Sequence, residues 1–209
     1  MGKVQVIKRS PIYRDIEEEL DYIFEPVEDS ITIKKTKTGY EARYLVQDDN
    51  PMSPEEMDDD SLFLVNYHRD FEVRRDEVIT KDDLVNWYRQ DCRDYDDREF
   101  TELYHIFALS CLVHSGVWLS LSRSFSCDLG GWDTSHVGAV LACKKEWPKE
   151  ADALAAAELK VQEWNQYLSG DIYGIVKETY NKKKIQVDHD SCWGFYGHKY
   201  ALEELKEGI

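Results

Sequence analysis

The chain has 209 residues, of which 42% are hydrophobic and 12% aromatic, so it has enough apolar side chains for a folded core and does not have the composition of a disordered protein. Its 42 acidic residues exceed its 26 lysines and arginines, and the net charge of −16 argues against direct binding to nucleic acid. The longest apolar stretch, residues 106–121, is short for a membrane span, and the N-terminus lacks a signal peptide's apolar core. We therefore expect a soluble cytoplasmic protein.

The first part of the chain predicts a small appendage. Its expected elements, in order, are a strand at residues 4–7, a helix over Pro11–Phe24, and a hairpin with strands Ile31–Lys35 and Tyr40–Val46. Thr38-Gly39 provides the turn of the hairpin. A polar segment with two prolines, residues 47–60, follows as a loop, so we expect an appendage over residues 1–46 and a main domain over residues 47–209.

The main domain mixes strands and helices without the regular alternation of a parallel α/β fold. Its expected elements are a buried strand at 61–68, a helix starting near Thr80, strands at 102–113 and 117–121, a helix over 148–169, a hairpin of 172–178 with 184–188 around Tyr180-Asn181, and a helix at 201–207. A buried helix is the alternative for 102–113. This order predicts an α+β fold, with a mixed or antiparallel sheet packed by the long helix.

The helix over 148–169 has the clearest signals. Pro148 suits a first helical turn, the middle is rich in alanine, and Gly170 suits the position just after the last turn. We expect its buried side to consist of its larger apolar residues, namely Leu154, Leu159, Val161, Trp164, Tyr167 and Leu168.

Four phrases identify a resemblance when they are taken together. They are DDNPMSPEEMDDDSLFLVNYHRDFEV, HSGVWLSLSRSFSCDLGGWDTSHVG, EWNQYLSGDIYG and DSCWGFYG, and they lie within residues 45–200. In this order and spacing the chain resembles a widespread family of small acidic proteins encoded by bacteriophages and related mobile elements. In place of the family's Cys-Pro-Trp-Asp-Ser-Gly-Gln phrase, this chain carries Cys127 to His136, which keeps the Trp-Asp pair but has added glycines. The resemblance implies a mobile-element setting and a host cytoplasm, and it implies no activity.

The negative charge is concentrated in one stretch. Residues 41–100 contain 19 Asp and Glu against 8 Lys and Arg. A concentrated acidic surface steers a protein towards basic clefts, including clefts that normally bind DNA. We expect a host protein with a basic cleft as the partner, with aromatic residues such as Trp87 or Tyr95 buried on binding. The candidate partner-binding residues form two groups: Asp48, Asp49, Glu55, Glu56, Asp58, Asp59 and Asp60, and then Asp91, Asp94, Asp96, Asp97 and Glu99. The alternative is a solvated acidic loop and a charged helix end.

A second hypothesis is a small enzyme with a cysteine nucleophile. Cys127 would be activated by His114, and Asp133 would orient that histidine, if the two loops that carry them meet in space. The alternative is that Cys127 and Cys192 are packed and inert, as we expect for Cys111 and Cys143.

Metal and cofactor binding are not expected. The acidic loop lacks the glycine and glutamate positions of an EF-hand calcium site. A zinc site from Cys127, His136, His189 and Cys192 would have poor spacing. The segment Asp190–Gly197 has a structural interpretation instead, as a closing strand in which Asp190 makes a turn and Gly194 and Gly197 adopt positive φ.

Overall fold

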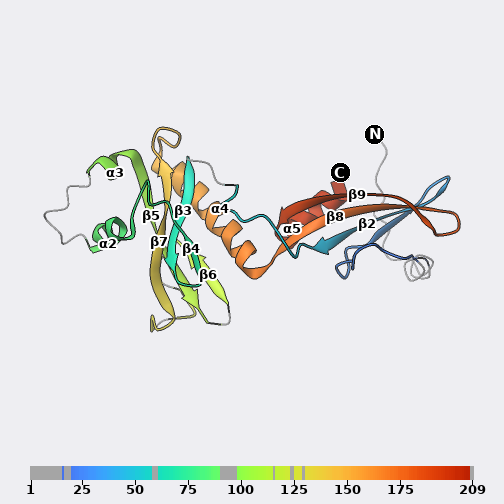
Figure 1. Cartoon of the computed structure of the whole chain (residues 1–209), viewed down its shortest axis with the longest axis horizontal. Coiled ribbons are helices and arrows are strands. Elements are labelled where there is room, and N and C mark those ends of the chain that lie inside the picture. Colours follow the sequence, from blue (N-terminus) through green and yellow to red (C-terminus); the bar gives the residue numbers. More distant parts are fainter. Residues whose placement is uncertain are drawn as a thin grey trace. The chain divides into compact units, whose positions relative to one another are not determined.

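A computed structural model of the chain divides it into two compact units. Unit 1 consists of residues 1–51 and 171–209, and unit 2 consists of residues 52–170. Each unit is built on its own antiparallel sheet, and helices pack on both sheets (Figure 1), so the predicted α+β class is confirmed. The structure describes residue 16 and residues 20–57, 61–89, 98–114, 116–122, 125–128 and 130–207.

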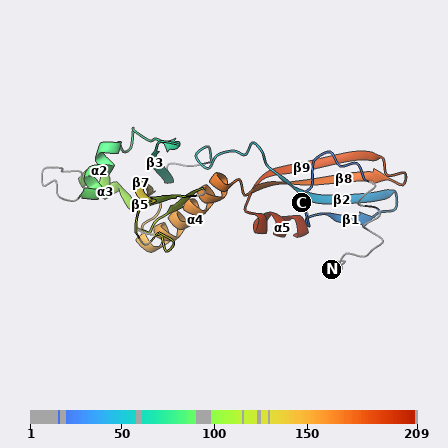
Figure 2. The same cartoon turned by 90° about the horizontal axis from the view of Figure 1, so that it is seen from below.

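Unit 1 is a four-stranded sheet made from both ends of the chain. Its strand order is β1 (Thr32–Lys35), β2 (Gly39–Gln47), β8 (Ile172–Asn181) and β9 (Gln186–Tyr196). Helix α5 (His198–Glu207) packs on one face of this sheet (Figure 2), where Ala201 and Leu205 join Leu45, Ile175 and Phe195 in a hydrophobic cluster. The hairpin at Thr38-Gly39 and the C-terminal helix are therefore confirmed. The second hairpin is also present, but its turn follows Asn181 instead of lying at Tyr180-Asn181, because both residues still belong to β8.

The division into units differs from the expected boundary between residues 46 and 47. All nine residues of β2 pair with β8. Residues 171–209 therefore belong to unit 1 with the N-terminal segment, and not to the unit formed by residues 52–170. The physical cause is that β2 needs a partner on its second edge, and the hairpin β8–β9 supplies it.

The helix expected over Pro11–Phe24 does not continue to Phe24. Residues 20–24 are not helical, and Leu20 instead packs with Ala42 and Tyr180 on the face of the sheet away from α5. The expected strand at residues 4–7 and the earlier part of that helix, except Ile16, lie outside the described residues.

A buried carboxylate fastens this N-terminal segment to the sheet. Glu178 is fully buried, and its Oε1 accepts hydrogen bonds from the Ile23 backbone N–H (2.9 Å) and the Tyr44 hydroxyl (3.0 Å). Its Oε2 accepts one from the Tyr180 hydroxyl. Burial, together with the hydrogen bond to Glu178, raises the pKa of Tyr44 and of Tyr180 well above the ordinary value.

Unit 2 is a five-stranded sheet with a helix on each face. Its strand order is β4 (Phe71–Val73), β3 (Leu62–His68), β7 (Thr134–Cys143), β5 (Tyr104–Val113) and β6 (Val117–Ser120). Figure 2 shows helices α2 (Lys81–Arg89) and α4 (Glu150–Ser169) on opposite sides of β5 and β7, and α3 (Arg98–Leu103) leads into β5. These bounds confirm the predicted strands at 61–68 and 117–121, while the strand expected at 102–113 starts at Tyr104 because residues 102 and 103 end α3. None of the described helices is long and apolar enough to cross a membrane.

The buried side of helix α4 is the expected one at Val161, Trp164, Tyr167 and Leu168, which join the core cluster, but not at its two leucines nearest the N-terminus. Its buried residues are Ala153, Ala157, Val161 and Trp164, which recur with the helical period, whereas Leu154 and Leu159 are 38% and 62% exposed. Small alanines allow the helix to approach the strands closely, so the larger leucines lie outside the contact. Gly170 ends the helix in the left-handed conformation, as predicted, whereas Pro148 lies before the cap residue Lys149 and not in the first turn, because the helix begins at Glu150.

Helix α2 begins with a reciprocal cap at the predicted position. The Thr80 backbone N–H donates to Asp83 Oδ2 (2.8 Å), and the Asp83 N–H donates to Thr80 Oγ1 (3.3 Å). This arrangement satisfies two backbone donors that a helix start leaves open.

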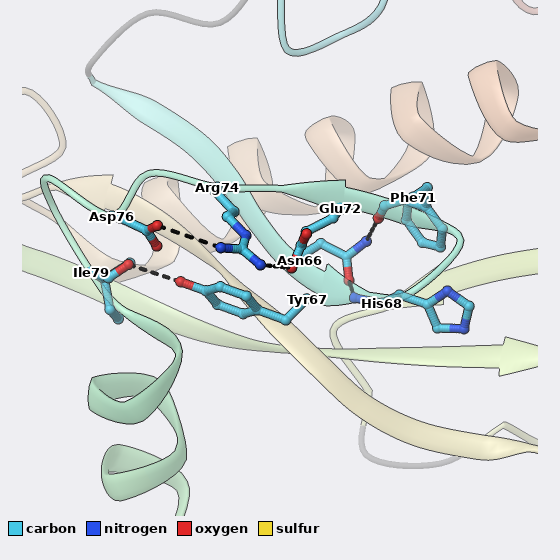
Figure 3. A network of polar contacts seen from close by, with 8 residues as sticks. All are labelled: Asn66, Tyr67, His68, Phe71, Glu72, Arg74, Asp76 and Ile79. Atoms are coloured by element: carbon cyan, nitrogen blue, oxygen red, sulfur yellow. Dashed lines mark hydrogen bonds and ion pairs between the residues drawn. The ribbon is translucent and has the colours of Figure 1, made fainter.

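A polar network fixes the β3–β4 hairpin and the loop that follows it (Figure 3). The Asn66 side chain donates to the Phe71 carbonyl (2.6 Å) and accepts from the His68 N–H (3.0 Å). Arg74 contacts Glu72 at 2.7 Å and Asp76 at 3.9 Å. The network ties the hairpin to its own loop, and we assign it a structural role.

The same network makes Tyr67 an unusual phenol. Its hydroxyl donates to the Ile79 carbonyl (2.9 Å), and burial, followed by the negative charge of Asp76, raises its pKa from 10.0 to about 12. The folded state therefore favours the neutral phenol, and this contribution to stability is present below pH 10 and is lost as the pH rises towards 12.

We expect the difference in absorbance at 295 nm between the wild type and Tyr67→Phe to titrate with a midpoint near pH 12. A midpoint near pH 10 would show that Tyr67 ionises as a solvated phenol and would contradict the burial described above. The variant also loses the bond to Ile79, which costs about 1 kcal/mol at neutral pH.

Candidate functional site

The most exposed large apolar side chain of the described residues is Trp132, at 91%. It lies in the segment between β6 and β7, which we call the Trp132 loop (residues 125–133, with residue 129 outside the described residues). Indole rings are normally buried, at least in part, because they remove a large apolar area from water. A Trp left almost entirely in solvent therefore marks a candidate binding site.

Asp128 organises the Trp132 loop from its centre. Its carboxylate accepts hydrogen bonds from the backbone N–H groups of Trp132 (3.1 Å) and Asp133 (3.0 Å) and from Thr134 Oγ1 (2.7 Å). The hydrogen bond from Thr134, helped by the backbone donors, lowers the pKa of Asp128 below 3.8. The ionised carboxylate thus holds the chain on both sides of the indole.

Two glycines shape the same loop. Gly131 has a φ of +65°, which side chains rarely adopt. A Cβ at Gly130 would lie 2.5 Å from Cδ1 and 2.8 Å from Nε1 of Trp132, so the pyrrole edge of the indole rests where any other residue would collide. The conformation of the exposed ring therefore depends on the Gly-Gly pair.

The end of the loop is held against the β5–β6 turn. His114 Nδ1 lies 3.2 Å from Asp133 Oδ2, and the Val113 N–H donates to the Asp133 carbonyl at 3.1 Å. The thiol-enzyme hypothesis required that the loops carrying His114 and Asp133 meet, and in the structure these two side chains are in contact. Both side chains are substantially exposed, so the pair contributes little to stability.

Cys127 is not part of that pair. It is exposed, and within the described residues no hydrogen bond joins it to His114. Cys192 is also exposed, so the expectation that these two cysteines are packed is wrong, whereas Cys111 is buried as expected and Cys143 is half-buried.

Removing the central carboxylate is expected to loosen the loop without unfolding unit 2. In Asp128→Ala the amides of Trp132 and Asp133 lose their acceptor and should exchange with solvent faster, while amides of β5 and β7 stay protected. Because the folded pKa is lowered, the wild-type contribution is present above pH 3.8 and is lost as the pH falls through the folded value. Amide exchange measured by NMR checks the effect of the variant and the pH dependence of the wild type. Unchanged exchange at Trp132 in the variant would show that Asp128 does not hold the loop.

A second pair that the sequence did not indicate lies on the α2 face of the sheet. The buried Ser110 places its Oγ 3.1 Å from His136 Nδ1, and the ring of Tyr88 stacks on His136. The Tyr88 hydroxyl accepts from the Leu109 N–H and donates to the Gly138 carbonyl. A bulge next to Ser110 shifts the register and brings His136 opposite it. Within the described residues no carboxylate orients His136, so the pair ties α2 to the sheet.

The candidate acidic residues are only partly described. Asp48 is half-buried and Asp49 is exposed, both in unit 1, whereas the exposed Glu55 and Glu56 belong to unit 2. The Glu56 carboxylate accepts from the Ser53 N–H at 2.8 Å, within a local turn. The other candidates lie outside the described residues or, for Glu99, have an undescribed side chain; they are Asp58, Asp59, Asp60, Asp91, Asp94, Asp96, Asp97 and Glu99.

The expected aromatic anchors are placed differently. Trp87 is half-buried and packs with Tyr88 against the hydrophobic cluster between α2 and the sheet, so its ring is not fully available to a partner. Tyr95 lies outside the described residues. Trp132 was missed because its signal, a Gly-Gly pair before an aromatic residue, resembles an ordinary turn.

The metal candidates are divided between the units. Cys127 and His136 belong to unit 2, while His189 and Cys192 lie on β9 in unit 1. Among the described residues no group of three or more His, Cys, Asp or Glu could hold a metal ion.

The segment Asp190–Gly197 contains the end of β9, as predicted, but Asp190 pairs with Lys177 within the strand and does not make the expected turn. Gly194 and Gly197 have φ values of 87° and 90°, and Asp190 accepts from the Ser191 N–H at 2.9 Å. Trp193 lies over Gly174, where a Cβ would come within 2.4 Å of its ring, and contacts Phe24 edge to face. These contacts account for the segment without a ligand.

The chain matches no family model, no curated protein and no solved structure. The resemblance to a phage-encoded family therefore stays an expectation.

Proposed function

We propose that the protein is an accessory protein of a phage or mobile element that binds, and thereby inhibits, a host protein with a basic, nucleic-acid-binding cleft. The observation that carries the proposal is the segregation of charge between the units. Unit 2 contains 24 Asp and Glu against 12 Lys and Arg, which is −12 of the total −16. The negative electrostatic field of this unit attracts a basic surface to one part of the molecule and repels DNA from it.

Capture from bacterial lysate tests this proposal. The immobilised protein should retain a nucleic-acid-processing protein at low salt and release it when excess duplex DNA is added, because both compete for one basic cleft. Retention that DNA does not reverse would contradict the proposal that the protein occupies a cleft that normally binds DNA.

A pair of matched variants separates local charge from total charge. The test variant Glu55→Gln, Glu56→Gln, Asp94→Asn, Asp97→Asn should lose most of the captured protein. The control variant replaces four exposed glutamates elsewhere in unit 2 by glutamine, namely Glu77, Glu102, Glu146 and Glu158. Equal loss in both variants would assign binding to total charge and remove the acidic groups from the proposal.

A thiol enzyme is the second candidate, favoured by one observation, the 3.2 Å contact between His114 and Asp133. A cysteine activated by this pair would react quickly with iodoacetamide near neutral pH, and His114→Ala would slow it. Cys192 is the internal control, since it is also exposed. On our main proposal the two cysteines react at similar rates, whereas much faster reaction at Cys127 would favour the enzyme.

A further inference from the structure

Several residues of the Trp132 loop hold the indole of Trp132 in solvent. The positive φ of Gly131 favours glycine, the ring in its present position leaves no space for a Cβ at Gly130, and Asp128 fixes the backbone on both sides of the indole. Within the described residues the ring stacks on no other aromatic residue, and at 91% exposure it adds almost nothing to the core. Glycines are costly in a folded chain and exposed indoles leave apolar area in water, so the fold itself does not account for this arrangement. The arrangement is explained by a partner that uses the ring.

The charges beside the ring define the kind of partner. Asp128 and Asp133 flank Trp132 in the chain, and unit 2 as a whole is strongly negative. Phosphate and carboxylate ligands are repelled from such a site, whereas a cation is attracted both to the indole face and to the carboxylates.

Asp133 has room for a cation beside its contact with His114. His114 approaches Oδ2, and within the described residues Oδ1 accepts no hydrogen bond. A guanidinium is planar, stacks on an indole and donates in a fork to a carboxylate, whereas an ammonium does only part of this. The site therefore suits arginine better than lysine.

We infer that the Trp132 loop is an arginine-binding anchor, in which the indole of Trp132 stacks on a guanidinium of the partner and the carboxylate of Asp133 pairs with it. This inference rests on the proposed function, since it names the contact that a basic partner would make. A pre-organised loop loses little conformational entropy on binding, which is how a few anchors dominate the affinity of an interface.

Titration of the whole protein with defined peptides tests the anchor. The probes are acetylated, amidated (Gly-Arg)₄ and (Gly-Lys)₄, followed by the indole N–H signals in NMR, with Trp132 assigned from Trp132→Phe. We expect the Trp132 signal to shift saturably, with the arginine peptide bound about fivefold more tightly than the lysine peptide. The signals of Trp164 and Trp193 are internal controls and should stay in place.

Variants then identify the carboxylate. Asp133→Asn should weaken the arginine peptide about fivefold, whereas Glu158→Gln, which removes the same charge from an exposed position on α4, should change its affinity less than twofold. Equal effects of the two variants, or equal affinity for the two peptides, would overturn the arginine anchor. If the Trp132 signal stays fixed while amide signals of residues 55–60 and 91–99 move, the inference fails and the acidic binding surface stands. If no signal moves with either peptide, the arginine anchor and the acidic binding surface are both contradicted.

Discussion

Replacing Glu178 by alanine is expected to destabilise unit 1 by about 3 kcal/mol or more. The change leaves the Ile23 N–H and the Tyr44 hydroxyl without their acceptor, whereas the Tyr180 hydroxyl keeps the Asp21 carbonyl at 3.2 Å. Each unsatisfied buried donor costs about 1–3 kcal/mol, and a void is left where the carboxylate was. The N-terminal segment should then separate from the sheet.

Hydrogen exchange followed by mass spectrometry resolves this effect by unit. Peptides from β2 and β8 should lose protection in Glu178→Ala, while peptides from β5 and β7 in unit 2 keep theirs. Glu178→Gln is the control, because its side-chain oxygen still accepts and the cost should be smaller. Unchanged protection of β8 in the alanine variant would mean that the buried carboxylate is not needed to hold the segment.

Gly138→Ala is expected to have the largest effect in unit 2. Gly138 lies in β7, between Asn66 of β3 and Leu109 of β5, and a Cβ there would come within 2.0 Å of the Val65 carbonyl oxygen. The obstacle is backbone, so it cannot rotate away, and β3 must move from β7. Overpacking in a core costs about 1–3 kcal/mol, and we expect about 3 kcal/mol or more here because the ladder itself is displaced.

The matched control is Gly116→Ala in the turn between β5 and β6. Among the described residues, the only atom within 4 Å of its Cβ is Trp118 Nε1 at 3.7 Å, an ordinary contact, so the change should stay within about 0.5 kcal/mol. Denaturant unfolding followed by Trp fluorescence compares the two variants, since five of the six tryptophans lie in unit 2. Equal midpoints would contradict the close approach of β3 and β7.

Local signals in the sequence located most elements. The Thr38-Gly39 turn, the Thr80 cap and Gly170 each lie where the structure places them, because each acts on the backbone within a few residues. The face of α4 was predicted less well, since the choice between alanines and leucines depends on how closely the sheet approaches.

Long-range pairing carried no comparable signal. The edge of β2 is completed by β8 from the far end of the chain, and two strands that meet across a sheet leave no pattern of fixed period in the sequence. This is why the domain boundary expected at residue 46 differs from the observed units.

The candidate site was predicted in part. The sequence offered the contact of His114 with Asp133 only as a condition of the enzyme hypothesis, whereas the roles of Asp128 and Trp132 depend on hydrogen bonds and exposure that only coordinates give. The bulge that pairs Ser110 with His136 could not be predicted either, because no particular residue type in the sequence marks a one-residue shift in strand register.

The central claim is that unit 2 binds its partner by charge, and the salt dependence of affinity tests this most directly. The dissociation constant for the captured protein should be measured from about 0.05 M to about 0.5 M NaCl. We expect binding to weaken by at least roughly tenfold over this range, because screening shortens the reach of the acidic field. An affinity that stays constant over the same range would contradict the account and indicate an apolar interface.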